Sequence, residues 1–265
     1  MLIPVISSYL IWINRHKISF DNATSWPKVA TIFIGIGAIG YILSYIYGNL
    51  NNEADTLLVN LAPGIIIFWG LFIVIFGTKS FKAVLFPLTF LTLMLPLPSF
   101  VLNETVNILQ MASANVSAFV FKLFNIPFLR NGTVFSLPGM TIEVAKECSG
   151  IRSSLALVVL SLVAAYLFLE TRRRQVILII TVLPVSIFKN ALRIVLLAYL
   201  GVYVDKGFIT DSLLHRQGGK PFLFIAAGIL LLLLWGLRVN EKRSKKASAD
   251  QDIVSIKATR CGPVM

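Results

Sequence analysis

Charged residues are scarce in this chain: Asp, Glu, Lys and Arg together make up 14% of its 265 residues, while hydrophobic residues make up 57%. A soluble domain of this size needs far more polar side chains to cover its water-facing surface, so the composition excludes one. Several apolar runs approach or exceed the roughly 20 residues that a helix needs to cross a bilayer. The sequence therefore predicts an all-α polytopic membrane protein surrounded by the lipid bilayer.

Acidic residues are the scarcer sign of charge, with 12 Asp and Glu against 24 Lys and Arg, which gives a formal net charge of +12. A nucleic-acid-binding protein would present a basic face with interleaved aromatic residues on a soluble domain. Here the basic residues form short clusters at the ends of apolar runs, as the positive-inside rule of membrane proteins describes. We expect no nucleic-acid partner.

The apolar runs predict about six transmembrane helices and an N-terminal half-helix over residues 1–13. The third span is expected to stop at the Pro96-Leu97-Pro98 segment, because proline ends a helix. The predicted spans cover residues 29–47, 56–76, 83–97, 151–169, 175–200 and 221–237.

Two further segments have a different pattern. Residues 101–124 carry polar side chains at helical spacing opposite apolar ones, which predicts an amphipathic helix in the outer interface rather than a span. Residues 133–137 and 140–144 flank Pro138-Gly139, and this pattern predicts a short β-hairpin with a turn at its centre.

The basic clusters orient the predicted spans. When Arg172–Arg174 and the C-terminal tail are placed in the cytoplasm, the basic segments at 15–28 and 79–82 also fall inside, and the acidic loop at 49–55 falls outside. We expect residues 1–238 to form one membrane domain. We expect residues 239–265 to form a basic, disordered cytoplasmic tail.

Cysteine and histidine are rare, with two of each. Cys148 and Cys261 are predicted on opposite sides of the membrane, which excludes an intrachain disulfide. His16 and His215 are also predicted on opposite sides, and this argues against a histidine-based metal site. We expect no metal and no cofactor.

Three of the rare polar residues are expected at one depth, the outer membrane boundary. Cys148 and Arg193 lie 24 and 19 positions from the Arg172–Arg174 cluster, or about 36 Å and about 28 Å of helix. His215 precedes Arg238 by 23 positions, which puts it beyond the outer end of the last span. These spacings indicate a shared depth but not lateral contact.

Cys148 lies in a polar cluster at the N-terminus of a predicted helix, where free N–H groups and the helix dipole favour thiolate over thiol. Arg152 lies one turn further along the same face and adds positive charge, and Glu147 precedes the cysteine directly. Most lone cysteines in helical membrane proteins are small buried hydrophobes. A structural and a nucleophilic interpretation of Cys148 therefore both stay open.

Arg193 and Asn190 share one face of an otherwise apolar run. Arg193 is either an anchor that reaches the lipid headgroups or a fixed cation that stabilises an oxyanion, to which Asn190 could add a hydrogen bond. His215 is either a solvated loop residue or the base and acid that a cysteine nucleophile requires.

Three segments of the chain together resemble the signature regions of the exosortase/archaeosortase family. They are Glu147-Cys-Ser-Gly-Ile-Arg152, Asn190-Ala-Leu-Arg-Ile194 and His215-Arg-Gln-Gly-Gly219. The resemblance implies a membrane cysteine transpeptidase in which Cys148 is the nucleophile and Arg193 and His215 complete the catalytic set. Arg152, Asn190 and Glu147 would then bind substrate or support these residues.

The same resemblance implies partners and a location. The substrates of the family are exported proteins with a C-terminal tail made of a short motif, often Pro-Glu-Pro, a transmembrane helix and a basic cluster. The expected location is the cytoplasmic membrane of a prokaryote, with the active site outside and the C-terminus in the cytoplasm. The family is associated with exopolysaccharide systems.

Two alternatives stay open from the residues alone. The chain could be a transporter or a structural membrane subunit of an exopolysaccharide export system, although such proteins place polar groups near mid-bilayer and the central spans here are almost wholly apolar. A membrane acyltransferase or rhomboid-like protease would need a different nucleophile motif, and the sequence has no Gly-x-Ser-x-Gly.

Overall fold

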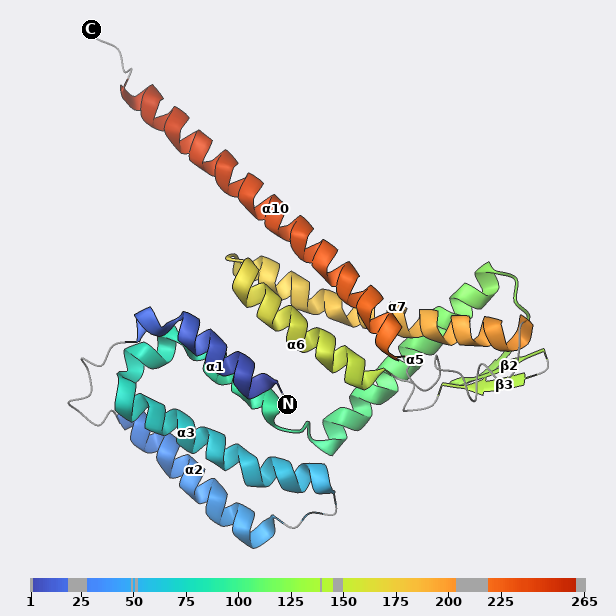
Figure 1. The fold of residues 1–265 in the computed structure, drawn as a ribbon, viewed down its shortest axis with the longest axis horizontal. Helices are drawn as coiled ribbons and strands as arrows, with labels where there is room; N and C mark the ends of the chain where they lie inside the picture. Colours follow the sequence, from blue (N-terminus) through green and yellow to red (C-terminus); the bar gives the residue numbers. More distant parts are fainter. Residues whose placement is uncertain are drawn as a thin grey trace. The chain divides into compact units, whose positions relative to one another are not determined.

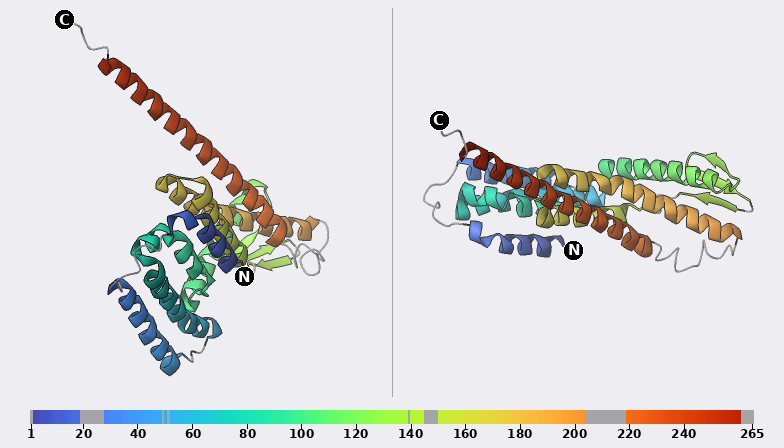
Figure 2. Two further views of the ribbon diagram at one scale, coloured as in Figure 1. Left: turned by 60° about the vertical axis from the view of Figure 1, so that its left-hand side comes forward. Right: turned by 90° about the horizontal axis from the view of Figure 1, so that it is seen from above.

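The computed structural model divides into two compact units, Met1–Asn103 and Glu104–Met265. The residues that it describes are 2–18, 28–48, 50, 52–138, 140–144, 150–203 and 219–260. Within each unit the chain is almost entirely helical, and the second unit adds one small sheet (Figures 1 and 2).

The helices and strands confirm the predicted all-α polytopic fold class, since six helices are long and apolar enough to cross a membrane. The predicted N-terminal half-helix is α1. In chain order the elements are α1 (Ile3–Ile13), η1 (Arg15–Lys17), α2 (Lys28–Tyr47), α3 (Glu53–Ala83), α4 (Leu85–Phe90), η2 (Leu91–Met94), α5 (Ser99–Leu123), β1 (Leu129–Asn131), β2 (Val134–Leu137), β3 (Met140–Glu143), α6 (Ile151–Phe168), α7 (Arg172–Tyr203) and α10 (Gly219–Arg260).

Five of the six long apolar helices, namely α2, α3, α6, α7 and α10, correspond to predicted spans. The prediction of one continuous span over residues 83–97 is wrong, because that segment forms only the short helices α4 and η2. The sixth helix of sufficient length is α5, which is the least apolar and the most buried of the six. Its placement in the membrane interface stays a prediction.

The path through the first unit explains why the third predicted span is broken. Gly77 has a φ of 76° inside α3, a left-handed conformation that interrupts the helix and that glycine adopts readily. The Asp55 carboxylate accepts hydrogen bonds from the Ser99 backbone N–H and hydroxyl, at 2.7 and 2.5 Å. The chain that leaves the start of α3 therefore returns to it at the start of α5, by way of short helices.

The half-helix α1 packs against these short helices. The chain tightens from α4 into the 3₁₀-helix η2, so carbonyls near the junction lose regular helical partners. Ser7 Oγ of α1 donates to the Pro87 carbonyl at 2.7 Å, and Trp69 Nε1 of α3 donates to the Leu88 carbonyl at 3.2 Å. Side chains thus satisfy backbone groups that an apolar environment would leave unpaired.

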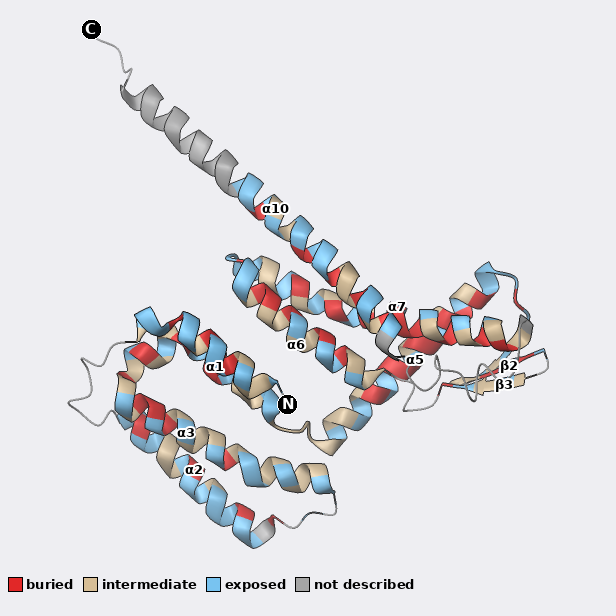
Figure 3. Ribbon diagram, in the orientation of Figure 1, coloured by how far each residue is buried: buried red, intermediate tan, exposed pale blue. Residues whose placement is uncertain are grey.

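Helices α2 and α3 pack closely in the same unit. A Cβ at Gly37 would lie 2.5 Å from Ile67 Cγ1, and one at Gly70 would lie 2.6 Å from Ile34 Cγ1. Small residues at a membrane helix crossing allow this close backbone approach. Large apolar side chains on the other face of α2 are exposed and fit a lipid environment (Figure 3).

In the second unit, α6, α7 and α10 pack together around an apolar core. At one end the Glu241 carboxylate accepts hydrogen bonds from the backbone N–H of Glu170 (3.3 Å), the backbone N–H of Thr171 (2.8 Å) and the Thr171 hydroxyl. Arg174 Nη1 donates to the Leu237 carbonyl at 3.1 Å. We call these five residues the capped end, and they fix the register of α10 on the α6–α7 pair.

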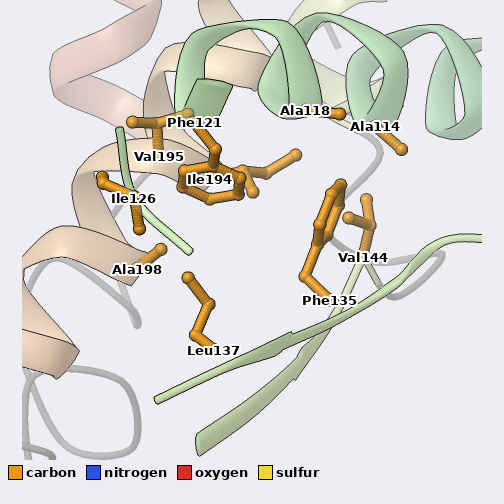
Figure 4. Packing of buried hydrophobic residues seen from close by; sticks show 10 residues of the cluster. All are labelled: Ala114, Ala118, Phe121, Ile126, Phe135, Leu137, Val144, Ile194, Val195 and Ala198. Atoms are coloured by element: carbon orange, nitrogen blue, oxygen red, sulfur yellow. The ribbon is translucent and has the colours of Figure 1, made fainter. Parts of the chain in front are cut away.

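A second core joins α5, the sheet and the C-terminal half of α7. The strands lie in the order β1-β2-β3, both pairs antiparallel. Phe135 of β2 is fully buried and meets Phe121 of α5 edge-to-face, with ring centroids 5.4 Å apart (Figure 4). The predicted hairpin is confirmed as β2 and β3, and β1 is an additional strand.

Helix α10 continues to Arg260. Its length has a local reason, because no glycine or proline occurs between Gly236 and Gly262 and the segment is rich in Lys, Arg and Ala, which favour helix. The membrane domain of residues 1–238 and the disordered cytoplasmic tail of residues 239–265 stay predictions.

Candidate active site

At the end opposite the capped end, α6 begins against α7. Gly150, which precedes α6, lies against the turn of α7 that carries Lys189 and Asn190, since a Cβ at Gly150 would be 3.3 Å from both Asn190 Oδ1 and Lys189 Nζ. Gly150 follows Cys148 by two positions, so the two Cα atoms are at most about 7 Å apart. The cysteine segment and the Asn190 turn therefore meet at this glycine.

Two physical requirements select glycine at position 150. Its φ of 72° lies in the left-handed region, which costs other residues about 1–2 kcal/mol. A side chain would also crowd the Lys189 ammonium and the Asn190 amide. These requirements give a structural reason for the glycine of the Cys-Ser-Gly-Ile-Arg segment.

Lys189 belongs to this site although the sequence analysis does not single it out. Its ammonium donates a hydrogen bond to Ser153 Oγ across the two helices, and Ser153 in turn donates to the Gly150 carbonyl at 2.9 Å. Lys189 is only 5% exposed. The available signal was a lysine inside an apolar run, because ionisable residues within membrane helices usually have a function. We call Gly150, Ser153, Lys189, Asn190 and Arg193 the open end.

Several buried polar atoms at or near the open end have no hydrogen-bond partner among the residues that the structure describes. They are Ser154 Oγ, Ser186 Oγ, Asn190 Oδ1, Asn190 Nδ2 and Arg193 Nε. Most buried polar groups in proteins are paired, and a buried unpaired one is costly. Asn190 is the extreme case, since it is 1% exposed with both amide atoms unpaired. The open end thus has spare hydrogen-bonding capacity.

The predicted site residues fall into two groups. Asn190 is buried, Arg193 is half-buried one turn further along α7, and Arg152 is exposed at the second position of α6. Their places are described, but their roles stay predictions. Cys148, Glu147 and His215 lie outside the described residues.

Gln110 of α5 holds the chain just before the cysteine segment. Its side-chain amide donates to the Val144 carbonyl, and both residues are buried. Val144 precedes Cys148 by four positions, and Gly150 follows it by two. The described residues on either side of the Cys148 segment, Val144 and Gly150, therefore contact α5 and α7 respectively.

The start of α10 lies at the same end of the three-helix group as the start of α6 (Figures 1 and 2). From the capped end, Gly219 lies 22 residues before Glu241, or about 33 Å of helix, and Ile151 lies 20 residues before Thr171, or about 30 Å. His215 precedes Gly219 by four positions, so its Cα is within about 14 Å of the start of α10. The shared depth of His215 with Cys148 and Arg193 stays a prediction.

A metal site has no support among the described residues, where no group of three or more His, Cys, Asp or Glu side chains lies close enough to hold an ion. The polar groups of the open end are ammonium, guanidinium, amide and hydroxyl groups. Positively charged donors of this kind bind anions or stabilise developing negative charge.

Six helices that are long and apolar enough to cross a membrane define the class of the protein, a multi-pass helical membrane protein. The family is narrower: the model of the transmembrane exosortase family matches residues 1–235, and the chain belongs to that family. No curated protein and no solved structure matches it significantly. Family membership supports a membrane transpeptidase role in general and exported proteins as its substrates.

Proposed function

We propose that this protein is a membrane cysteine protease and transpeptidase that cleaves C-terminal sorting signals from exported proteins. The observation that carries the proposal is the contact of Gly150 with Asn190. This contact joins the segment that contains Cys148 to the turn of α7 that contains Arg193. It also brings that segment to buried donors that have no partner among the described residues.

In the first step the Cys148 thiolate attacks the carbonyl carbon of the scissile peptide bond. The oxygen of the resulting tetrahedral intermediate is negative, and the Arg193 guanidinium and Asn190 amide supply hydrogen-bond donors for it. The C–N bond then breaks, His215 gives a proton to the departing amine, and a thioester links the substrate to Cys148.

In the second step an acceptor resolves the thioester. An amine acceptor attacks the thioester carbonyl after losing a proton to His215, and the Cys148 thiolate leaves, so a new amide bond is formed. Water acting in the same way releases a free carboxylate. Both routes regenerate the enzyme, and the acceptor decides between transfer and hydrolysis.

The proposed substrates carry a short motif, a transmembrane helix and a basic cluster at the C-terminus. We assign the basic cluster of the substrate to the cytoplasm and the motif to the outer surface of the cytoplasmic membrane. Three consecutive arginines, Arg172–Arg174, lie at the capped end, whereas the first turn of α6 carries one arginine, Arg152, and this difference supports the orientation through the positive-inside rule.

The experiment that tests the proposal co-expresses the protein with an exported protein that carries such a tail. We expect the wild type to release the tail and Cys148→Ala to accumulate the full-length precursor in the membrane. Mass spectrometry of the processed protein then identifies the cleaved bond and any attached acceptor.

Cys261→Ala is the matched control, because it removes the other cysteine from the far end of the chain. It should process the substrate as the wild type does. Unchanged processing by Cys148→Ala, at equal membrane insertion, would show that Cys148 is not the nucleophile. The protein would then have to be considered again as a transporter or as a structural membrane subunit.

A further inference from the structure

Strand β3 leaves one backbone edge unpaired and runs directly into the segment that contains Cys148. In the sheet order β1-β2-β3, β3 pairs only with β2 among the described residues. Its last residue, Glu143, precedes Cys148 by five positions. An edge strand presents a row of free N–H and C=O groups to another extended chain.

The pairing pattern identifies which backbone groups of β3 face outward. The Val144 N–H donates to the Thr133 carbonyl at 3.1 Å. Hydrogen-bonded pairs alternate along an antiparallel ladder, so Ile142 also directs its backbone groups to β2, opposite Phe135. Thr141 and Glu143 therefore direct their N–H and C=O groups to the free edge.

We propose that the free edge of β3, at Thr141 and Glu143, binds an extended segment of the substrate as an added strand. This inference rests on the proposed function, and it assigns the surface that guides the scissile segment. Main-chain hydrogen bonds of this kind bind a segment without requiring one particular side chain. The surface thus suits a protease whose several substrates share a short motif.

The proposed occupant is a peptide segment rather than a lipid, for two reasons. The groups on offer are alternating backbone donors and acceptors, which match the backbone of an extended peptide. The chain from Glu143 to Cys148 also spans at most about 17 Å. A strand paired with β3 can therefore extend to the nucleophile within a few residues.

The edge is held rigid before any partner arrives. Ile142 packs against the core in which Phe135 is fully buried, and Gln110 holds the Val144 carbonyl (Figure 4 shows Phe135 and Val144). The side chains of Thr141 and Glu143 are exposed on the opposite face. Because the strand is already ordered, binding there costs little conformational entropy.

Hydrogen exchange with residue resolution tests the proposal on the full chain. The probe is a synthetic peptide of the ten or so residues around the cleavage point mapped by mass spectrometry, added to Cys148→Ala so that it binds without being cleaved. We expect exchange at Thr141 and Glu143 to slow about tenfold or more. Exchange at Ile142, which faces β2, and at Val144, which donates to the Thr133 carbonyl, should change less than about twofold and serves as the internal control.

Kinetics of two variants at one position supply a second readout. Thr141→Pro removes an outward N–H while leaving the ladder to β2 intact, and proline is tolerated on edge strands. We expect KM to rise about fivefold, the loss of one net hydrogen bond, with kcat nearly unchanged. Thr141→Val keeps the N–H and should behave as the wild type.

The results separate this proposal from the proposed function. The peptide could slow exchange equally at residues 141, 142, 143 and 144, or at none of them, while Thr141→Pro leaves KM unchanged. This result would show that β3 is not the substrate-binding edge, even if Cys148 is essential. Conversely, the peptide could slow exchange at Thr141 and Glu143 but not at Ile142 and Val144, while Cys148→Ala still cleaves the tail substrate. This result would support the binding edge of β3 and show that Cys148 is not the nucleophile.

Discussion

The two ends of the α6–α7 pair make opposite use of polar residues. At the capped end, the Glu241 carboxylate accepts three hydrogen bonds and the Arg174 guanidinium has a carbonyl partner. At the open end, both amide atoms of Asn190 and the Nε of Arg193 have none among the described residues. The two side chains at the centre of this comparison are both buried, since Glu241 is 5% exposed and Asn190 is 1% exposed, although Glu170 and Thr171 beside Glu241 are exposed.

This difference separates groups that stabilise the fold from groups held ready for a ligand. A buried polar group adds to stability only when it is paired, and an unpaired one subtracts from it. Functional sites often retain such costly groups, because the substrate or transition state supplies the missing partner. Substitutions at the capped end should therefore change stability, and those at the open end should change activity.

The largest expected effect is at Arg193. Arg193→Gln removes the cation proposed to face the oxyanion, and it should lower kcat/KM for tail processing about 100-fold, the usual loss for one oxyanion donor. The melting temperature should change little, because the Nε has no partner to lose. Arg173→Gln, an exposed residue at the far end of the same helix, is the control and should be active. A loss of less than about threefold in Arg193→Gln would remove this residue from the site.

The second effect, at Glu241, should be a loss of stability rather than of activity. Glu241→Gln weakens the three hydrogen bonds that a charged carboxylate accepts, and it should lower the free energy of unfolding by about 2 kcal/mol. Thermal unfolding in detergent measures this change, and Lys242→Ala is the exposed neighbouring control. Processing of the tail substrate, measured at a temperature where Glu241→Gln is still folded, should match the wild type. A large loss of processing by the folded variant would contradict the division between the two ends.

A smaller effect on stability is expected where the cysteine segment meets α7. Gly150→Ala forces alanine into a left-handed conformation, at a cost of about 1–2 kcal/mol, and crowds Lys189 and Asn190. We expect lower stability and also lower activity. Gly228→Ala in α10, where a Cβ meets nothing within 4 Å, should instead be neutral or stabilising. Equal behaviour of the two variants would contradict the strain assigned to Gly150.

The smallest effect on stability is expected at Asn190, where a substitution should leave stability equal or raise it. Asn190→Leu keeps the approximate shape and removes two unpaired buried atoms, so stability should stay equal or rise by up to about 1 kcal/mol. Processing should fall about tenfold, since a donor to the proposed oxyanion is lost. A variant that loses stability and keeps activity would identify Asn190 as a structural residue.

Much of this fold follows from local pattern. Apolar runs bounded by basic clusters predicted five of the long helices, and the Pro138-Gly139 turn predicted the β2–β3 hairpin. Strand β1 escaped prediction because its residues, Leu129–Asn131, show no alternation, and the pairing comes from β2. The broken return path after α3 escaped because the left-handed Gly77 has no signature in composition.

Residue spacing along the helices predicts depth but not partners. The shared depth of Cys148, Arg193 and His215 stays a prediction, and the contact of Gly150 with Asn190 comes from the structure alone. Spacing along a helix does not reveal which face meets a neighbour, so the bond between Lys189 and Ser153 could not be foreseen. That bond is made by side chains 36 positions apart.

The thioester is the intermediate that tests the central claim most directly. Purified enzyme mixed with a tail substrate is quenched in acid, digested and analysed by mass spectrometry for an acyl group, with and without neutral hydroxylamine. We predict an adduct on Cys148 that hydroxylamine removes and that is absent in Cys148→Ala. An adduct on Ser153, resistant to hydroxylamine and persisting in Cys148→Ala, would instead make Ser153 the nucleophile with Lys189 as its base, and would contradict the account.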